Sequence, residues 1–394
     1  MKVLFIGDVF EEKYETYVNQ AAKANVEYSS VLFQRKMLNG FSANGIDVTV
    51  LSAPAIGAYP QRSNLMFCKS FAENSHFRYV DYCNIWGYRN LSQEHALKEA
   101  VCRFLKENSE DQILIYVYSA HNPFIAAARY AKLLRPDIRL CLVVPDLPQY
   151  MNLESNRSKV YDILKSIDNR AIKYNSKSID TFLLLTEPMR EKLKVGDRPC
   201  MVQEGIIEDI PVNREYLQKG PTKNIVYTGK LYKQFGILTL VNTFMNIDDP
   251  ELRLIICGTG DAKNYVKKCA DIDSRIEYKG LVSPEEAAEF VRLADVLVNP
   301  RMNDNEYTKY SFPSKNLEYL MSGRPVVACM LDGIPPVYRD FMYCFSNAED
   351  LEDAIRSAID SSEQNEKYQK FLNYASKNLT AASVVARMVQ LLSD

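Results

Sequence analysis

The sequence is poor in residues that several functional classes require. It has one tryptophan, three histidines, and no two cysteines separated by two residues. Zinc sites are commonly built from such cysteine pairs together with histidines, so no metal site is expected. No segment approaches the ~20 consecutive apolar residues of a membrane-spanning helix, and the start, MKVLFIGD, has the pattern of a first strand rather than of a cleavable signal.

The composition is that of a soluble intracellular protein. Its nine cysteines are scattered singly, several within apolar runs, which indicates buried free thiols in a reducing compartment. The net charge of −2 lacks the basic excess of a nucleic-acid-binding protein. We expect a cytoplasmic protein that binds no nucleic acid and carries no cofactor. The charge is compatible with a membrane-tethered acceptor and with peripheral contact at the inner face of the membrane, and the sequence favours no oligomeric state.

A chain of 394 residues exceeds the usual size of one domain, roughly 100–200 residues, and predicts two. Short apolar runs alternate with segments of helical period, which is the pattern of parallel sheets covered by helices. The strands expected first along the chain span residues 2–6, 46–52, 112–118, 139–145 and 181–186. The helices expected between them cover residues 31–41, 93–107, 123–134, 158–175 and 188–193.

A second series follows a polar stretch, residues 204–223, that contains glycines and prolines. Its expected strands span residues 224–227, 252–257, 276–279, 296–298 and 326–329. The prediction is an α/β fold with two Rossmann-like doubly wound domains, residues 1–205 and 206–365, facing a central cleft. Residues 366–394 are expected to form helices that pack across the domain junction.

The most informative motif is Phe312-Pro-Ser-Lys315, followed by Glu318 at the start of an apolar helix. Ser314 is expected at the N-cap, Lys315 in the first turn, and Glu318 on the inward face. An ordinary cap with an acid that complements the helix dipole is one interpretation. A lysine in the first turn opposes the dipole, however, which favours a phosphate bound there.

Two further turns directly follow expected strands. In residues 227–236, Gly229 would let the backbone approach a phosphate, and Lys230 and Lys233 would neutralise its charge. A solvated loop with two ordinary lysines fits the same residues. In Cys257-Gly-Thr-Gly-Asp261, Lys263 stands where a dinucleotide-binding fingerprint requires a third glycine. Gly258 is therefore expected in a tight turn that lines the cleft.

A histidine follows a strand of the first domain, in Tyr118-Ser-Ala-His-Asn-Pro123. Isolated histidines are mostly structural. His121 is expected at the mouth of the cleft, however, and this position is as compatible with a functional role as with a structural one. Asp271-Ile-Asp273 has the spacing of a metal-binding motif, and we interpret it as an acidic turn instead.

Taken together, several segments resemble a bacterial glycosyltransferase of the GT-B fold, similar to glycosyltransferase family four and especially its capsule and exopolysaccharide members. The segments are Tyr82-Cys-Asn-Ile-Trp-Gly-Tyr-Arg-Asn-Leu-Ser92, Val144-Pro-Asp-Leu-Pro148, Leu185-Thr-Glu-Pro-Met189, Asn299-Pro-Arg301, and residues 227–236 and 307–323. The resemblance implies retaining transfer of a hexose-type sugar from a nucleotide-sugar donor, with UDP favoured, and without an essential metal. The acceptor would be a saccharide or lipid-linked saccharide in cell-surface polysaccharide synthesis.

The resemblance also implies roles for single residues. Glu318 matches the second glutamate of the family's Glu-x7-Glu motif and would hold the ribose hydroxyls. Lys230 occupies the position of a diphosphate-binding arginine, Val282 would lie against the base through its backbone, and His121 matches a histidine near the donor sugar and the acceptor. We further assign catalytic roles to Lys315 and Glu306, donor contacts to Gly229, Lys233, Gly258, Arg301 and Ser314, and acceptor contacts to Gly7 and Asp146.

Two positions depart from the family pattern. Tyr310 stands eight residues before Glu318, where the family has its first glutamate, with Glu306 or Asp304 as substitutes. Phe235 replaces the lysine that normally precedes the helix glycine, so Lys233 or Lys315 must supply that charge.

These departures keep two alternatives open. One is a nucleotide-sugar epimerase, against which the few histidines argue. The other is a non-catalytic partner subunit that binds nucleotide sugars, which the phenol at Tyr310 would explain.

Overall fold

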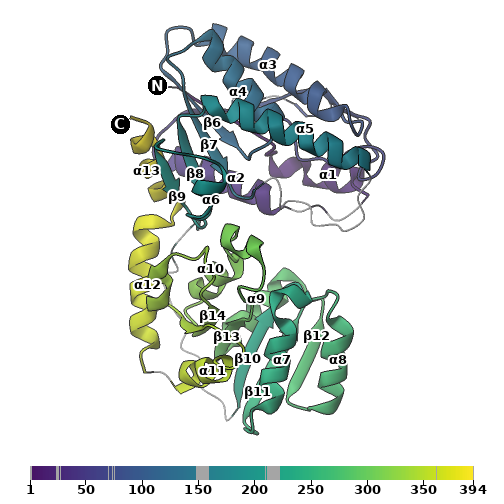
Figure 1. The fold of residues 1–394 in the computed structure, drawn as a ribbon, viewed down its shortest axis with the longest axis vertical. Coiled ribbons are helices and arrows are strands. Elements are labelled where there is room, and N and C mark those ends of the chain that lie inside the picture. The colour runs from purple at the N-terminus through teal and green to yellow at the C-terminus, as the bar shows by residue number, and fades with distance from the viewer. Residues whose placement is uncertain are drawn as a thin grey trace. The chain divides into compact units, whose positions relative to one another are not determined.

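The computed structural model describes residues 2–23, 26, 28–69, 71–72, 74, 76–147, 159–208, 210, 222–360 and 362–393. They form two compact units, residues 1–208 with 379–394 and residues 209–378 (Figure 1). Each unit contains one large sheet in which neighbouring strands run parallel. None of the helices in these ranges is both long and apolar enough to cross a membrane.

The large sheet of the first unit has the strand order β4, β2, β1, β6, β7, β8, β9. Residues 3 to 7 of β1 are buried, and residues 3 to 6 pair with both β2 and β6, which explains the apolar sequence of this strand. The strands are β1 Lys2–Gly7, β2 Val48–Ser52, β4 Phe77–Tyr79, β6 Ile113–Tyr118, β7 Arg139–Val144, β8 Thr181–Leu184 and β9 Cys200–Val202. A short antiparallel pair is formed by β3 Phe67–Cys68 and β5 Tyr82–Cys83.

The helices of the first unit pack in two groups. One group is α3, α4 and α5, in which α4 packs against both others, and the other includes α2 and α13 (Figure 1). Gly40 of α2 permits that second contact, because a Cβ there would stand 2.3 Å from the carbonyl oxygen of Ala381. The helices are α1 Glu15–Ala21, α2 Ser29–Ala43, α3 Arg89–Glu107, α4 Asn122–Leu134, α5 Lys159–Asn175, α6 Met189–Lys192 and α13 Ala381–Ser393.

The sheet of the second unit has the order β12, β11, β10, β13, β14, β15. This is the Rossmann order, in which the first strand of the unit, β10, lies between its second and fourth. The strands are β10 Lys223–Thr228, β11 Leu252–Cys257, β12 Ile276–Gly280, β13 Val296–Asn299, β14 Val326–Cys329 and β15 Tyr343–Phe345. The helices are α7 Ile237–Asn246, α8 Lys263–Ile272, α9 Pro284–Leu293, α10 Ser314–Met321, α11 Leu351–Asp360 and α12 Gln364–Asn378.

Both units have a topological switch point, where ligands of open parallel sheets bind. It lies between β1 and β6 in the first unit and between β10 and β13 in the second. The predicted fold class of two doubly wound α/β domains is confirmed. The expected terminal segment 366–394 divides between the units, with α12 in the second and α13 in the first. Packing of these helices across the junction stays a prediction.

Candidate functional site

The turns that follow β10 and β11 meet at two glycines. A Cβ on Gly258, whose φ is +136°, would stand 1.8 Å from the carbonyl oxygen of Gly229. Gly229 has φ +153°, and its amide donates to the Cys257 carbonyl at 2.9 Å. Only residues without a side chain permit this approach, so the carboxyl end of β10 presents bare backbone beside the switch point of the second unit.

Lys315 lies against this turn. Its Nζ donates to Thr228 Oγ1 at 3.2 Å and to Glu318 Oε1 at 2.9 Å. Tyr319 connects the same helix to the end of β10, because its buried hydroxyl accepts a hydrogen bond from the Thr228 amide at 3.0 Å. The side chain of Lys315 is one-third exposed. Helix α10 therefore places the accessible amino group of Lys315 beside the turn at Gly229. Lys315 lies in the first turn of this helix, as the motif predicted.

Two expectations for α10 are wrong. The N-cap is Pro313 and not Ser314, which is the exposed first residue of the helix and forms no capping bond. Glu318 does not face inward, since 47% of its side chain is exposed. The buried residues of α10 are Asn316, Leu317, Tyr319 and Leu320, and the helical period places Glu318 opposite to them.

Arg301 follows β13, the strand next to β10 at the switch point. Its guanidinium lies 5.2 Å from the ring centre of Phe235 and 5.1 Å from that of Tyr307, and Nη2 donates to Ser311 Oγ at 2.9 Å. Burial lowers the pKa of Arg301. Its Nε is buried and bonded to no other group in the described ranges. A partly desolvated guanidinium beside the switch point is suited to bind an anion.

The other predicted donor residues lie around the same sheet end. Lys230 and Lys233 are exposed in the turn between β10 and α7, and the Lys233 amide donates to Asp261 Oδ1 at 2.9 Å. Glu306 is exposed at the start of the 3-10 helix Glu306–Tyr310. Val282 is half-buried between β12 and the N-cap of α9. Asp273, from the acidic motif, pairs with Arg275 at 2.7 Å.

A cavity of about 750 Å³ opens at the switch point of the first unit. Its walls come from the segments after β1 and β6 and from helices α3 and α5. The polar lining includes Asp8, Arg89, Asn90, His121, Lys165 and Asp168, and the apolar lining includes Trp86, Leu91, Leu164 and Ile167. His121 was predicted for this position; Asp8, Arg89, Asn90 and Asp168 were not.

His121 and Asp8 stand on opposite sides of the switch point of this sheet. Burial and the charge of Arg89 lower the pKa of His121 to about 3, so its imidazole is neutral at physiological pH. Burial raises the pKa of Asp8, and its hydrogen bond from Gln34 Nε2, 2.6 Å long, acts in the opposite direction. Perturbed groups that share a cavity are typical of functional sites.

The two predicted acceptor residues do not line this cavity. Gly7 is buried, and a Cβ there would stand 2.3 Å from Gln34 Oε1. Asp146 is exposed after β7. The neighbour of Gly7, Asp8, takes the lining position, and its place directly after the first strand is the signal that could have identified it.

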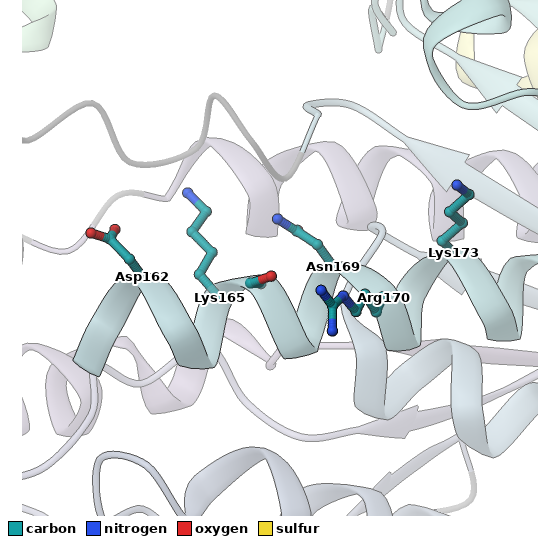
Figure 2. Close-up of a pocket in the computed structure, with 6 residues that line it drawn as sticks. Asp162, Lys165, Asn169, Arg170 and Lys173 are labelled. Carbon is teal, nitrogen blue, oxygen red and sulfur yellow. The ribbon is translucent and has the colours of Figure 1, made fainter. Parts of the chain in front are cut away.

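A second, open groove runs along α5 (Figure 2). Figure 2 shows Asp162, Lys165, Asn169, Arg170 and Lys173 projecting from this one helix. Among the residues that the structure describes, those lining this groove all come from α5 and give it a cationic helix face. Lys165 belongs to both the groove and the cavity.

Residues 222–361 match the family model described as glycosyl transferases group 1. Three solved structures with similar folds illustrate the wider likeness. Sucrose-phosphate synthase from Thermosynechococcus elongatus has 14% identity and a TM-score of 0.62, over 99% of this chain and 98% of that one. HepE from Anabaena, in complex with UDP, has 12% identity and a TM-score of 0.61, over 100% of both chains.

The third structure is WaaG, a glycosyltransferase involved in lipopolysaccharide biosynthesis, with 12% identity and a TM-score of 0.57 over 100% of both chains. Comparison with curated proteins gave no match. The chain therefore has the GT-B fold of these enzymes, and its second unit carries the sequence match to the group 1 glycosyl transferases.

Proposed function

We propose that this protein is a retaining glycosyltransferase, similar to family four, that uses a nucleoside diphosphate sugar. It moves a hexose-type sugar, from a UDP donor by preference, to a hydroxyl of a saccharide or lipid-linked saccharide. The observation that carries the proposal is Lys315, which lies beside the glycine turn after β10 within the matched residues. UDP in the HepE structure and the pathway of WaaG support the donor and a role in cell-surface polysaccharide synthesis, such as capsule or exopolysaccharide.

In the proposed reaction, the acceptor oxygen forms a bond to the anomeric carbon as the bond from that carbon to the diphosphate breaks. The electron pair stays on the diphosphate, which also receives the hydroxyl proton. Lys315 stabilises the developing negative charge, with Lys230 and Lys233 contributing from the neighbouring turn, and fixed charges of this kind are usually the largest catalytic term.

In this scheme Glu318 binds the ribose hydroxyls. Its carboxylate is exposed and forms an ion pair with Lys315. A bound donor would separate this pair, because the ribose diol would bind Glu318 and the diphosphate would bind Lys315. Val282 meets the base, while Glu306 or Asp304 supplies the carboxylate that Tyr310 lacks.

The cavity of the first unit suits a sugar acceptor. The carboxylate of Asp168 accepts hydrogen bonds from sugar hydroxyls, the amide of Asn90 both accepts and donates them, and Trp86 offers an aromatic face. We propose that the enzyme works in the cytoplasm at the inner membrane face, which its nine free cysteines support. The cationic face of α5, beside the exposed Ile163 and Ile167, supports peripheral contact with anionic headgroups.

The donor scheme predicts an effect for Arg301, whose guanidinium stacks on Phe235 where the family has a lysine. Arg301→Met is expected to weaken UDP binding about tenfold to hundredfold, the value of one charge-assisted contact. Titration calorimetry on the full chain measures this. Phe235→Lys on the same background should restore part of the affinity, and Arg292→Met, which removes an exposed arginine paired with Glu289, should leave it unchanged. Equal affinity for Arg301→Met and the unsubstituted protein would exclude Arg301 from the donor site.

A panel of UDP- and GDP-sugars, each with and without saccharide and lipid-linked acceptors, tests the function. We expect nucleotide release that depends on the acceptor. Interconversion of the nucleotide sugar without release would indicate the epimerase alternative. Binding without either reaction would indicate a non-catalytic subunit.

A further inference from the structure

A buried side-chain amide contacts the imidazole of His121. Gln93, from the first turns of α3, is 0% exposed, and its Oε1 lies 3.2 Å from His121 Nε2. Phe124 fixes the ring from the side in an edge-to-face contact with centroids 4.8 Å apart. His121 Nδ1 forms no hydrogen bond to any described residue, and the ring is half-buried in the cavity wall.

The direction of the Gln93 amide follows from the group behind it. The Tyr82 hydroxyl donates to the carbonyl oxygen of Pro54 at 2.9 Å, and a carbonyl can only accept. The Tyr82 oxygen is therefore available as an acceptor. Burial raises the pKa of Tyr82 well above its ordinary value, and the nearby Gln93 side chain acts in the opposite direction.

The orientation of the amide decides which ring nitrogen carries the proton. With its NH₂ toward Tyr82, Gln93 presents Oε1 to His121 and accepts a hydrogen bond from Nε2–H. The reverse orientation would oppose Gln93 Oε1 to a Tyr82 oxygen whose own hydrogen is already donated. Gln93 Nε2 is buried and forms no hydrogen bond to a described residue.

We infer that Gln93 is a positioning residue that fixes His121 in the Nε2–H tautomer, so that Nδ1 offers a lone pair to a substrate hydroxyl in the cavity. The inference rests on the proposed transferase function for the identity of that hydroxyl. With a proton fixed on the nitrogen that faces Gln93, the ring accepts a hydrogen bond at its other nitrogen and orients the sugar. The proton of the reacting hydroxyl still leaves with the diphosphate.

Burial, together with the charge of Arg89, keeps the His121 ring neutral. Within the described part of the chain, the charged side chains that line the same cavity are Asp8 after β1, Arg89 and Glu94 from α3, and Lys165 and Asp168 from α5. Glu94 is paired with Lys98 at 2.5 Å. Arg89, by contrast, acts directly on His121 and lowers its pKa together with burial. Titration of His121 should therefore cause no change in the turnover rate between pH 5 and 8.

The tautomer can be measured without substrate. The chain has three histidines, and His76 and His95 are exposed, so long-range ¹H–¹⁵N spectra of the labelled protein should give one distinct buried imidazole, assigned with His121→Asn. We expect that signal to show a protonated Nε2 and a bare Nδ1. A protonated Nδ1 in the unsubstituted protein would overturn the inference, whether or not transfer is ever detected.

Two variants test the role of Gln93. Gln93→Met keeps the volume and removes the amide, and Tyr82→Phe keeps the ring and removes the hydroxyl that directs the amide. Both should show a mixture of tautomers, and Gln93→Met should lower kcat about tenfold to hundredfold, as when a group that orients a ligating histidine is removed. Gln364→Met, at an amide in the second unit that donates to Gly323, is the matched control. A single unchanged tautomer in both variants would contradict the inference.

Discussion

Lys315→Ala is expected to lower kcat by roughly 10²–10³-fold, the loss seen when one group that stabilises transition-state charge is removed. Its Nζ lies 3.2 Å from Thr228 Oγ1 and beside the Gly229 turn, where a diphosphate would approach bare backbone. Steady-state nucleotide release at saturating donor measures the effect. The fold should persist, because the side chain is one-third exposed and α10 is anchored by Tyr319.

Lys370→Ala provides the matched control for this substitution. Lys370 is also in the second unit and also pairs with a glutamate on its own helix, Glu366 at 2.7 Å. Removing it abolishes a comparable surface ion pair without touching the turn after β10. Equal kcat values for Lys315→Ala and Lys370→Ala would remove Lys315 from the mechanism.

Gly236→Ala is expected to destabilise the protein by about 3–5 kcal/mol. Gly236 has φ +78°, and a Cβ there would stand 1.9 Å from the carbonyl oxygen of Pro300. The substitution therefore adds a clash between the start of α7 and the segment after β13 to the strain of a left-handed backbone. Urea unfolding followed by circular dichroism measures the loss.

Gly280→Ala separates the two contributions. Gly280 has φ +77°, nearly the same backbone conformation, and nothing lies within 4 Å of its added Cβ. Strain alone should cost about 1–2 kcal/mol there. If the two variants lose equal stability, the close approach of Gly236 to Pro300 does not contribute, and the described geometry of this turn is wrong.

The sequence was sufficient to predict the central strands and the edge strand β12, but not the other three edge strands of the two large sheets. Buried strands such as β1 and β6 contain continuous apolar runs bounded by turns, which is a local signal. The short strands β4, β9 and β15 were missed because two or three apolar residues form a strand only when a neighbour is there to pair with.

The same limit applies to the site. Lys315 was found because a lysine in a first helical turn is a local anomaly, whereas the outward direction of Glu318 depends on which face of α10 packs. Arg301 was placed at the donor site, yet its stacking on Phe235 joins residues far apart in sequence. Gln93 carries no local signal, since its role depends on meeting His121 and Tyr82 in the folded unit.

Proton NMR of the anomeric region, recorded while the protein reacts with a UDP-sugar and a saccharide acceptor, detects both the transfer of the sugar and its stereochemistry. We expect a new glycosidic signal with the anomeric configuration of the donor, which grows as UDP is released and is nearly absent with Lys315→Ala over the same time. A product of opposite configuration would contradict retention. A converted nucleotide sugar with no new glycosidic bond would contradict transfer itself.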